Sequence, residues 1–217
     1  VTEIPHTFVA DIDFNSGIGE LKDILEGEPY EAPMRPFGGS ESLAWTADSK
    51  SIIYVSRKKT GLEYSVSTNS DLYEYNLESG NTRNFTEGMM VYDTNPCISN
   101  DGNTRAWLSM EQDGCESDKN RLFVMDLKSG EKRDLTADWD YSIDGFAWSK
   151  DSKSIYFLAP FMGTVPMFSI NVESCKVDTV ATGMCDYASV APLENGTVIA
   201  TRTSFLEPND IYACTMG

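Results

Sequence analysis

The sequence predicts an all-β protein, a β-propeller with four-stranded antiparallel blades, of which the chain carries an incomplete run of about four to five blades. Three observations support this prediction: a turn phrase recurs along the chain, a strand phrase recurs between its copies, and the composition is that of a packed protein. Of the 217 residues, 41% are hydrophobic and 11% aromatic. This length and composition are sufficient for a hydrophobic core and exclude a disordered chain.

The first repeated phrase predicts a strand, a tight turn and a second strand. It reads Leu-Ala-Trp-Thr-Ala-Asp-Ser-Lys-Ser-Ile-Ile-Tyr at 43–54 and returns at 96–107, at 146–157 and, more weakly, at 191–200. Aligned on Asp48, Asp101, Asp151 and Asn195, the copies lie 53, 50 and 44 residues apart. Alternating apolar and polar residues rich in Ile, Tyr and Phe indicate half-buried strands, and Asp-Ser-Lys or Asp-Gly-Asn indicates the turn between them.

The second repeated phrase predicts a hairpin made of the other two strands of each blade. It reads Asp-Leu-Tyr-Glu-Tyr-Asn-Leu-Glu-Ser-Gly at 71–80, with further copies at 121–130, 166–174 and 8–17 and a shortened one at 209–214. Each repeat therefore holds four strands in about 45 residues. A four-stranded sheet has two faces to bury, and radial stacking buries both, which favours a propeller. A β-sandwich is the alternative, but it does not require one turn phrase to recur in register.

The order of the phrases gives the expected blades. Residues 41–88, 95–137 and 144–182 are expected to form complete blades, whereas 1–27 and 191–217 are expected to form partial ones. Closure of the two ends on each other would give a ring of only four blades with one strand too many. We therefore expect the chain to be a piece of a longer propeller.

Charge and motif content exclude several classes of function. The chain has 34 acidic and 17 basic side chains, a formal net charge of -17, so nucleic acid is an unfavourable partner. No stretch is long and apolar enough to span a bilayer. His6 is the single histidine, and no nucleophile elbow, P-loop, dinucleotide fingerprint or zinc motif is present. We expect no catalytic residues, no metal and no cofactor in this chain.

The cysteines leave the cellular compartment open. There are five, at positions 97, 115, 175, 185 and 214. Cys175 and Cys185 could meet across adjacent strands, and a structural disulfide would imply an oxidising compartment. Free buried thiols would imply nothing about location. The N-terminus shows no signal peptide, so we expect the chain to be mature, truncated or cytoplasmic. The expected location is periplasmic or secreted, with the cytoplasm as the alternative.

The repeated phrases resemble those of a known group of propellers. Trp-(Ser/Thr)-x-Asp-(Ser/Gly)-Lys, followed by Leu-Tyr-x-x-(Asp/Asn)-Leu-x-(Ser/Thr)-Gly and Leu-Thr, is similar to the repeat of TolB-type and prolyl oligopeptidase-type propellers. The more particular phrases are 35–41 leading into Trp45, 54–59 and 64–73. These resemble the N-terminal propeller of bacterial dipeptidyl-peptidase or acylaminoacyl-peptidase members of the prolyl oligopeptidase family.

This resemblance implies a partner and a role. In the family, the propeller precedes a C-terminal α/β-hydrolase domain that carries the catalytic Ser, Asp and His, to which no residue here corresponds. The propeller caps the active site and limits entry to short peptide substrates, and in some members its carboxylates anchor the substrate's free N-terminus. We therefore expect a gating and positioning part of a serine exopeptidase; the alternative is a free-standing TolB-like periplasmic propeller that binds a protein partner.

The resemblance also suggests where substrate contacts would lie. By family analogy, the loops between strands two and three of each blade and those between blades face the hydrolase domain. The expected loops are 57–70, 110–120, 160–166 and 202–209 in the first set and 28–40, 87–95, 138–144 and 185–188 in the second.

Six residues in these loops are candidates for substrate binding. Glu111 and Asp113 are carboxylates suited to an amine, with a solvated acidic hairpin tip as the alternative. Trp139, Asp140 and Tyr141 form an aromatic and acidic cluster suited to an apolar peptide side chain, with core packing or a domain contact as the alternative. Arg57 begins a basic run, Arg-Lys-Lys, that could meet an acidic surface or remain a solvated loop.

Overall fold

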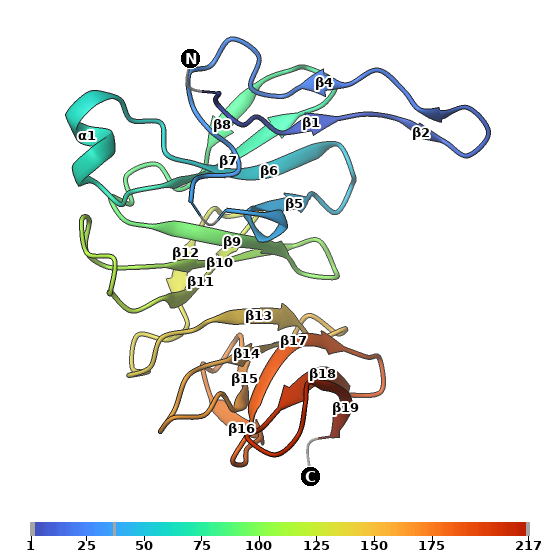
Figure 1. The fold of residues 1–217 in the computed structure, drawn as a ribbon, viewed down its shortest axis with the longest axis vertical. Helices are drawn as coiled ribbons and strands as arrows, with labels where there is room; N and C mark the ends of the chain where they lie inside the picture. The colour runs from blue at the N-terminus through green and yellow to red at the C-terminus, as the bar shows by residue number, and fades with distance from the viewer. Residues whose placement is uncertain (1–2, 37, 216–217) are drawn as a thin grey trace. The chain divides into compact units, whose positions relative to one another are not determined.

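A computed structural model describes residues 3–36 and 38–215 of the chain, so Phe37 of the 35–41 phrase lies outside the described residues. The described part holds three four-stranded antiparallel sheets and one three-stranded sheet (Figure 1). The four-stranded sheets comprise β5 (Leu43–Trp45), β6 (Ser51–Ser56), β7 (Asp71–Asn76) and β8 (Thr82–Asn84); β9 (Asp93–Ile98), β10 (Thr104–Ser109), β11 (Arg121–Asp126) and β12 (Lys132–Asp134); and β13 (Gly145–Trp148), β14 (Ser154–Leu158), β15 (Met167–Asn171) and β16 (Val177–Ala181). The three-stranded sheet comprises β17 (Asp186–Pro192), β18 (Thr197–Thr203) and β19 (Asp210–Thr215).

Four short strands at the start of the chain form a single projecting hairpin. They are β1 (Phe8–Val9), β2 (Ile12–Asp13), β3 (Gly17–Ile18) and β4 (Lys22–Asp23), and β1 pairs with β4 while β2 pairs with β3. The helical elements are a 3-10 turn at Ser40–Ser42 and the helix α1 (Gly61–Val66). Two compact units make up the chain, one of residues 1–96 with 112–116 and the other of 97–111 with 117–217.

Side chains of the turn phrase hold each first hairpin together, which explains why the phrase recurs. The Ser149 hydroxyl donates to Asp151 Oδ1 at 2.7 Å, and the Ser149 Oγ atom accepts the backbone N–H of Ser154 at 3.0 Å. Thr46 with Asp48 and Ser99 with Asp101 make the same bonds. The hydroxyl bond from Ser149 is the main reason that the pKa of Asp151 lies below its usual range. A hydroxyl followed two residues later by Asp is therefore a structural requirement of this turn.

The Thr that ends the second phrase is also structural. Thr136 is 2% exposed, and its Oγ1 atom accepts the backbone N–H of Leu122 at 2.8 Å. Thr86 is 0% exposed and accepts the N–H of Leu72 in the same way at 3.0 Å. These bonds tie the end of the fourth strand to the third, beyond the last backbone pair of the sheet. Phe85-Thr86 and Leu135-Thr136 thus mark the ends of the first two four-stranded sheets.

Each unit has its own buried core. In the first unit, β6 and β7 pack Ile52, Tyr54, Tyr73 and Tyr75 against residues 24, 25 and 32. The second unit has two clusters. One joins strands β10, β11, β13, β14 and β15 and contains Ala106, Leu108, Leu122, Val124, Leu135, Ile143, Trp148, Ile155, Phe157, Ala159, Phe168 and Ile170. The other joins β14 and β15 to β17 and β18, around Tyr156, Met167, Tyr187 and Val198.

One segment that was predicted to be a loop is part of a strand. Residues 185–188 were expected as a loop, yet β17 begins at Asp186 because these residues pair with β18 before a bulge between Ala188 and Ala191.

All five cysteines are free thiols. Cys175 is exposed in the turn between β15 and β16 and Cys185 is buried, so the two do not pair. Burial raises the pKa of Cys97 to about 11.

Candidate functional site

Side-chain contacts hold the connection between β6 and β7, residues 57–70, at its start, middle and end. At its start, the ammonium group of Lys58 forms an ion pair with Glu28. The same group lies 4.3 Å from the ring centre of Tyr73, 5.6 Å from that of Tyr54 and 5.9 Å from that of Tyr30. Three aromatic rings and a carboxylate therefore enclose one cation, which ties this segment to both strands and to residues 28–30.

A second set of contacts fixes the middle of segment 57–70. The Tyr64 hydroxyl donates to Glu31 Oε1 at 2.5 Å, and this bond is the main reason that the pKa of Tyr64 is raised. Glu31 Oε1 also accepts the backbone N–H of Arg35 at 3.0 Å. The Arg57 guanidinium lies 5.3 Å from the Tyr64 ring centre and donates from Nη1 to the Tyr64 carbonyl at 3.4 Å.

Asp113 fixes the end of the same segment. Its Oδ1 atom accepts the Ser67 hydroxyl at 2.7 Å and the backbone N–H groups of Thr68 and Asn69 at 2.8 and 3.0 Å. Gly114 donates its N–H to Thr68 Oγ1 at 2.9 Å. The Ser67 bond is the largest cause that holds the pKa of Asp113 below its usual value. Asp113 thus organises a neighbouring loop, a contact that its place in the sequence did not indicate.

The fixed segment presents apolar and basic side chains. Leu62 and Val66, both on α1, are 79% and 62% exposed. Arg57 is half-buried, and among the described residues it has no carboxylate partner. A short helix that directs large apolar residues into solvent while its ends are held by polar contacts has the properties of a contact surface.

In the second unit, the predicted aromatic residues Trp139 and Tyr141 contact each other. Their ring centres are 5.5 Å apart in an edge-to-face arrangement, and Tyr141 makes a similar contact with Phe161 at 4.9 Å. Trp139 also packs edge-on against Phe157 and Phe168, so it belongs largely to the core. Tyr141 is 38% exposed, which leaves it as the accessible end of this row of aromatic rings.

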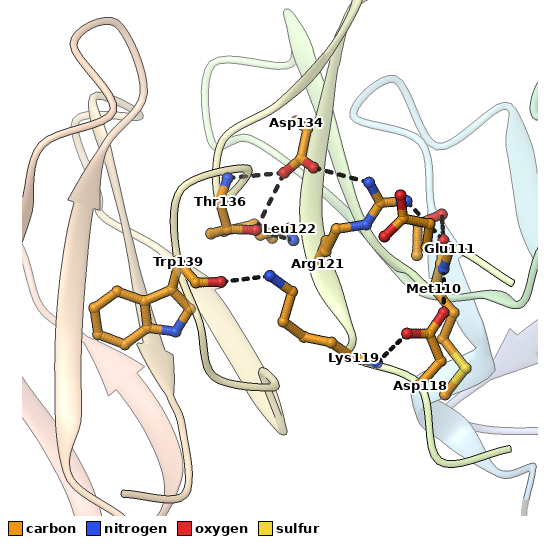
Figure 2. A network of polar contacts seen from close by, with 10 residues as sticks. Met110, Glu111, Asp118, Lys119, Arg121, Leu122, Asp134, Thr136 and Trp139 are labelled. Carbon is orange, nitrogen blue, oxygen red and sulfur yellow. Dashed lines mark hydrogen bonds and ion pairs between the residues drawn. The ribbon is translucent and has the colours of Figure 1, made fainter. Parts of the chain in front are cut away.

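The backbone that carries Trp139 is tied to the connection between β10 and β11 (Figure 2). The ammonium group of Lys119 donates a hydrogen bond to the Trp139 carbonyl. The Asp118 carboxylate accepts hydrogen bonds from the backbone N–H groups of Lys119, at 2.7 Å, and of Glu111, at 2.6 Å. Arg121, the first residue of β11, donates to the Met110 carbonyl at 2.9 Å.

Arg121 and Asp134 extend this network to the end of the fourth strand (Figure 2). The guanidinium Nη1 lies 3.2 Å from Asp134 Oδ2, and Asp134 Oδ1 accepts the backbone N–H of Thr136 at 2.8 Å. The predicted residues Glu111 and Asp140 are both exposed, and their carboxylates make no hydrogen bond or ion pair with the described residues. Lys119 and Arg121 were missed as organising residues because nothing in their local sequence indicates which distant carbonyl each one reaches.

Three connections of the second unit meet at Asp186. Asp186 pairs with Thr203 of β18, and its Oδ1 atom accepts the backbone N–H of Val165 at 2.9 Å. These connections carry four large apolar side chains that are 86–107% exposed: Met162, Met184, Phe205 and Leu206. We call these four residues the apolar rim.

Two classes of site find no support among residues 3–36 and 38–215. No group of three or more His, Cys, Asp or Glu side chains is arranged to hold a metal ion. No helix in this part of the chain is long and apolar enough to cross a membrane.

Comparison with solved structures defines the class of protein. The β-propeller domain of the Trilobed protease from Pyrococcus furiosus superposes with a TM-score of 0.61 at 14% identity, covering 94% of this chain and 57% of that one. Puromycin hydrolase gives 0.71 at 13% identity, over 95% and 33% of the two chains. A putative TolB from Agrobacterium tumefaciens gives 0.64 at 17% identity, over 95% and 68%. The chain is therefore part of a β-propeller with four-stranded antiparallel blades, as the repeats predicted.

Sequence comparison identifies the relatives within that class. Dipeptidyl-peptidase 5 of Porphyromonas gingivalis is 48% identical over 212 residues, and that of Porphyromonas endodontalis is 47% identical over 212. Each match covers 98% of this chain but only 31% and 30% of the relative. No family model matches the chain. The chain is thus homologous to part of dipeptidyl-peptidase 5, and the predicted resemblance to propellers of prolyl oligopeptidase-family peptidases is confirmed.

Proposed function

We propose that this chain is the non-catalytic propeller part of a dipeptidyl peptidase, in which it restricts entry to short peptides and positions them for an α/β-hydrolase domain of the same protein. The observation that carries the proposal is the 48% identity to dipeptidyl-peptidase 5 across 98% of the chain. The match spans 31% of that relative, and the proposal accordingly assigns catalysis to residues outside these 217.

The apolar rim supports the gating part of this proposal. Met162 lies in the connection between β14 and β15, and Phe205 and Leu206 lie in the connection between β18 and β19, so they occupy equivalent positions in two sheets. Contiguous exposed apolar side chains on a protein surface mark a site of interaction. Methionine adapts to varied apolar surfaces because its unbranched side chain is flexible. Such a rim is suited to contact a hydrolase domain around a passage for peptides.

The first test asks whether the full-length protein is a dipeptidyl peptidase. We expect the native gene to encode a protein about three times as long as this chain, which releases dipeptides from a chromogenic substrate and is blocked by a serine-directed inhibitor. A gene product that ends near Gly217 and shows no hydrolysis would overturn the proposal and favour a free-standing binding module.

The second test addresses gating. In the full-length protein, peptides of a few residues should be cleaved far faster than unfolded chains with the same N-terminal sequence. The double substitution Phe205→Ala and Leu206→Ala should reduce the difference in cleavage rate between short peptides and unfolded chains. Leu127→Ala is the matched control because Leu127 is exposed at the opposite end of its sheet, in the turn between β11 and β12. Equal rates for short and long substrates in the unaltered protein would refute the gating role.

A further inference from the structure

The projecting hairpin of residues 8–23 has one apolar face. Ile12 of β2 pairs with Ile18 of β3, so both side chains lie on the same face, whereas the next residue, Asp13, lies on the other. Ile12 and Ile18 are 70% and 73% exposed, and Phe14 at the tip is 100% exposed. A two-stranded hairpin alone is only marginally stable in water. An apolar face of this kind therefore needs a second surface to cover it.

An apolar groove of about 250 Å³ adjoins the base of the same hairpin. Residues 7–10 form one of its walls, and residues 43–45 with Ile52 form the other. Phe8 and Trp45, which face the groove from the two walls, are 52% and 53% exposed. The first unit thus has an exposed aromatic ring at the tip of the hairpin and an open groove at its base.

The hairpin runs past the end of the sheet β5–β8 at which the two tight turns lie. Lys22 of β4 donates its ammonium group to the carbonyl of Leu77, in the turn between β7 and β8, at 3.3 Å. Residues 10–21 continue beyond this contact, and Figure 1 shows the tip of the hairpin beyond the turn between β5 and β6. The helix α1 follows the end of β6 and so lies at the opposite end of the sheet.

The position of the tip determines which partner can cover the apolar face. In the proposed function, the hydrolase domain of the same protein contacts the end of the sheet that carries α1 and segment 57–70. The blades of a propeller surround one central channel and end at common rims. Further blades therefore do not reach a tip that extends past the turns, which leaves the surface of another molecule to cover the hairpin.

We propose that the hairpin binds a second copy of this chain, with the tip of each hairpin seated in the groove at the base of the other. This inference rests on the proposed function only for the place of the hydrolase domain. A two-fold axis through the middle of the paired hairpins produces the exchange, because an isologous interface brings each surface against its own copy in the reversed direction. Phe8 and Phe14 are about 20 Å apart along an extended strand. Tip and groove are thus too far apart to meet within one chain, whereas those of two chains meet.

The exposed apolar area is sufficient for such a dimer. It comprises six large side chains, all more than half exposed: Phe8, Ile12, Phe14, Ile18, Leu21 and Trp45. A fully exposed aromatic side chain alone contributes about 150–250 Å². The six together provide on the order of several hundred Å² per chain, comparable to the ~800 Å² that one partner contributes to a stable interface. None of them is charged, which favours contact there because each copy carries a formal net charge of -17.

Sedimentation equilibrium of the full-length protein tests the proposal. We expect a monomer–dimer equilibrium in which Phe14→Ser raises the dissociation constant by about tenfold or more, as for loss of an anchor side chain at an interface. Trp45→Ala should have a similar effect. Because the two side chains meet across the interface, the double variant should raise the constant by clearly less than the product of the two single effects. Leu127→Ser is the control, since Leu127 is exposed in the turn between β11 and β12, and it should leave the constant unchanged.

Several results would overturn the dimer. A monomer at every measurable concentration, or a dissociation constant that Phe14→Ser leaves unchanged, would show that the hairpin does not join two copies. Single effects that simply multiply in the double variant would show that tip and groove do not meet. If Phe14→Ser lowered the free energy of unfolding of the monomer, the rest of the same polypeptide would be what covers the hairpin. A dimer that releases no dipeptide would overturn the proposed function and leave this interface in place.

Discussion

The sheet β13–β16 and the hairpin of residues 8–23 have similar sequence patterns but opposite environments. In the sheet, Phe157 and Ile170 are 0% exposed and belong to a core shared with β10 and β11. In the hairpin, Ile12, Phe14 and Ile18 are 70%, 100% and 73% exposed. Alternation of apolar and polar residues therefore specifies strands in both places, but burial requires a second layer, which the described residues provide only for the sheet.

Segment 57–70 lies between these extremes. Its apolar residues are exposed like those of the hairpin, yet its backbone is held at several points by Lys58, Tyr64 and Asp113. Polar contacts thus provide here the order that apolar burial provides in the sheets. The following substitutions test that contrast, beginning with the largest expected effect.

Substitution of a core aromatic should be the most damaging change. Phe157 stacks on Phe168 with ring centres 5.5 Å apart and contacts Trp139 at 5.6 Å. Phe157→Ala should lower the free energy of unfolding by about 3–5 kcal/mol because it removes apolar contacts and leaves a cavity. Urea titration followed by tryptophan fluorescence measures this loss. A value below about 1 kcal/mol would mean that the sheet is not packed as described.

Loss of the enclosed cation should have an intermediate effect. Lys58→Met keeps the aliphatic stem but removes the ammonium group, leaving the half-buried Glu28 carboxylate without its partner. The expected loss is about 1–2 kcal/mol, smaller than for a fully buried pair because both groups retain some contact with solvent. Lys50→Met is the control because Lys50 is exposed in a turn of the same unit. Similar melting temperatures for the two variants would refute the anchoring role of Lys58.

Removal of the Asp113 charge should have a smaller effect that depends on pH. Asp113→Asn weakens the acceptor for Ser67, Thr68 and Asn69, at an expected cost of about 0.5–1 kcal/mol near neutral pH. The folded state lowers the pKa of Asp113. The stability that the Asp113 carboxylate contributes is therefore complete at pH values above its ordinary pKa near 3.8, and it is lost as the pH falls through the lowered pKa of the folded state. The difference in melting temperature between the two proteins should therefore narrow in acid. A difference independent of pH would contradict the role assigned to the charge.

Substitution in the hairpin should have almost no effect. Phe14→Ser removes a ring that is 100% exposed, so the free energy of unfolding should change by less than about 0.5 kcal/mol. The urea titration used for Phe157→Ala gives a direct comparison between two phenylalanines. A loss of more than about 2 kcal/mol in the full-length protein would show that the rest of the polypeptide covers the hairpin.

The sequence by itself determined the architecture, because the repeated phrases contain the residues that form the turns and strand ends of each blade. Ser149 and Asp151 close a turn across 2 residues, and Thr136 ends a blade by a bond to Leu122 across 14 residues. Alternating apolar and polar residues define the strands. Because each phrase is a contiguous stretch of residues, its resemblance to the repeat of peptidase propellers could be recognised from the sequence alone.

Only the tertiary structure decided what the candidate site residues contact. Asp113 reaches Ser67 across 46 residues, Tyr64 reaches Glu31 across 33, and Lys119 reaches the Trp139 carbonyl across 20. Pairings at such separations follow from how sheets and loops are placed, and no spacing in the sequence encodes them.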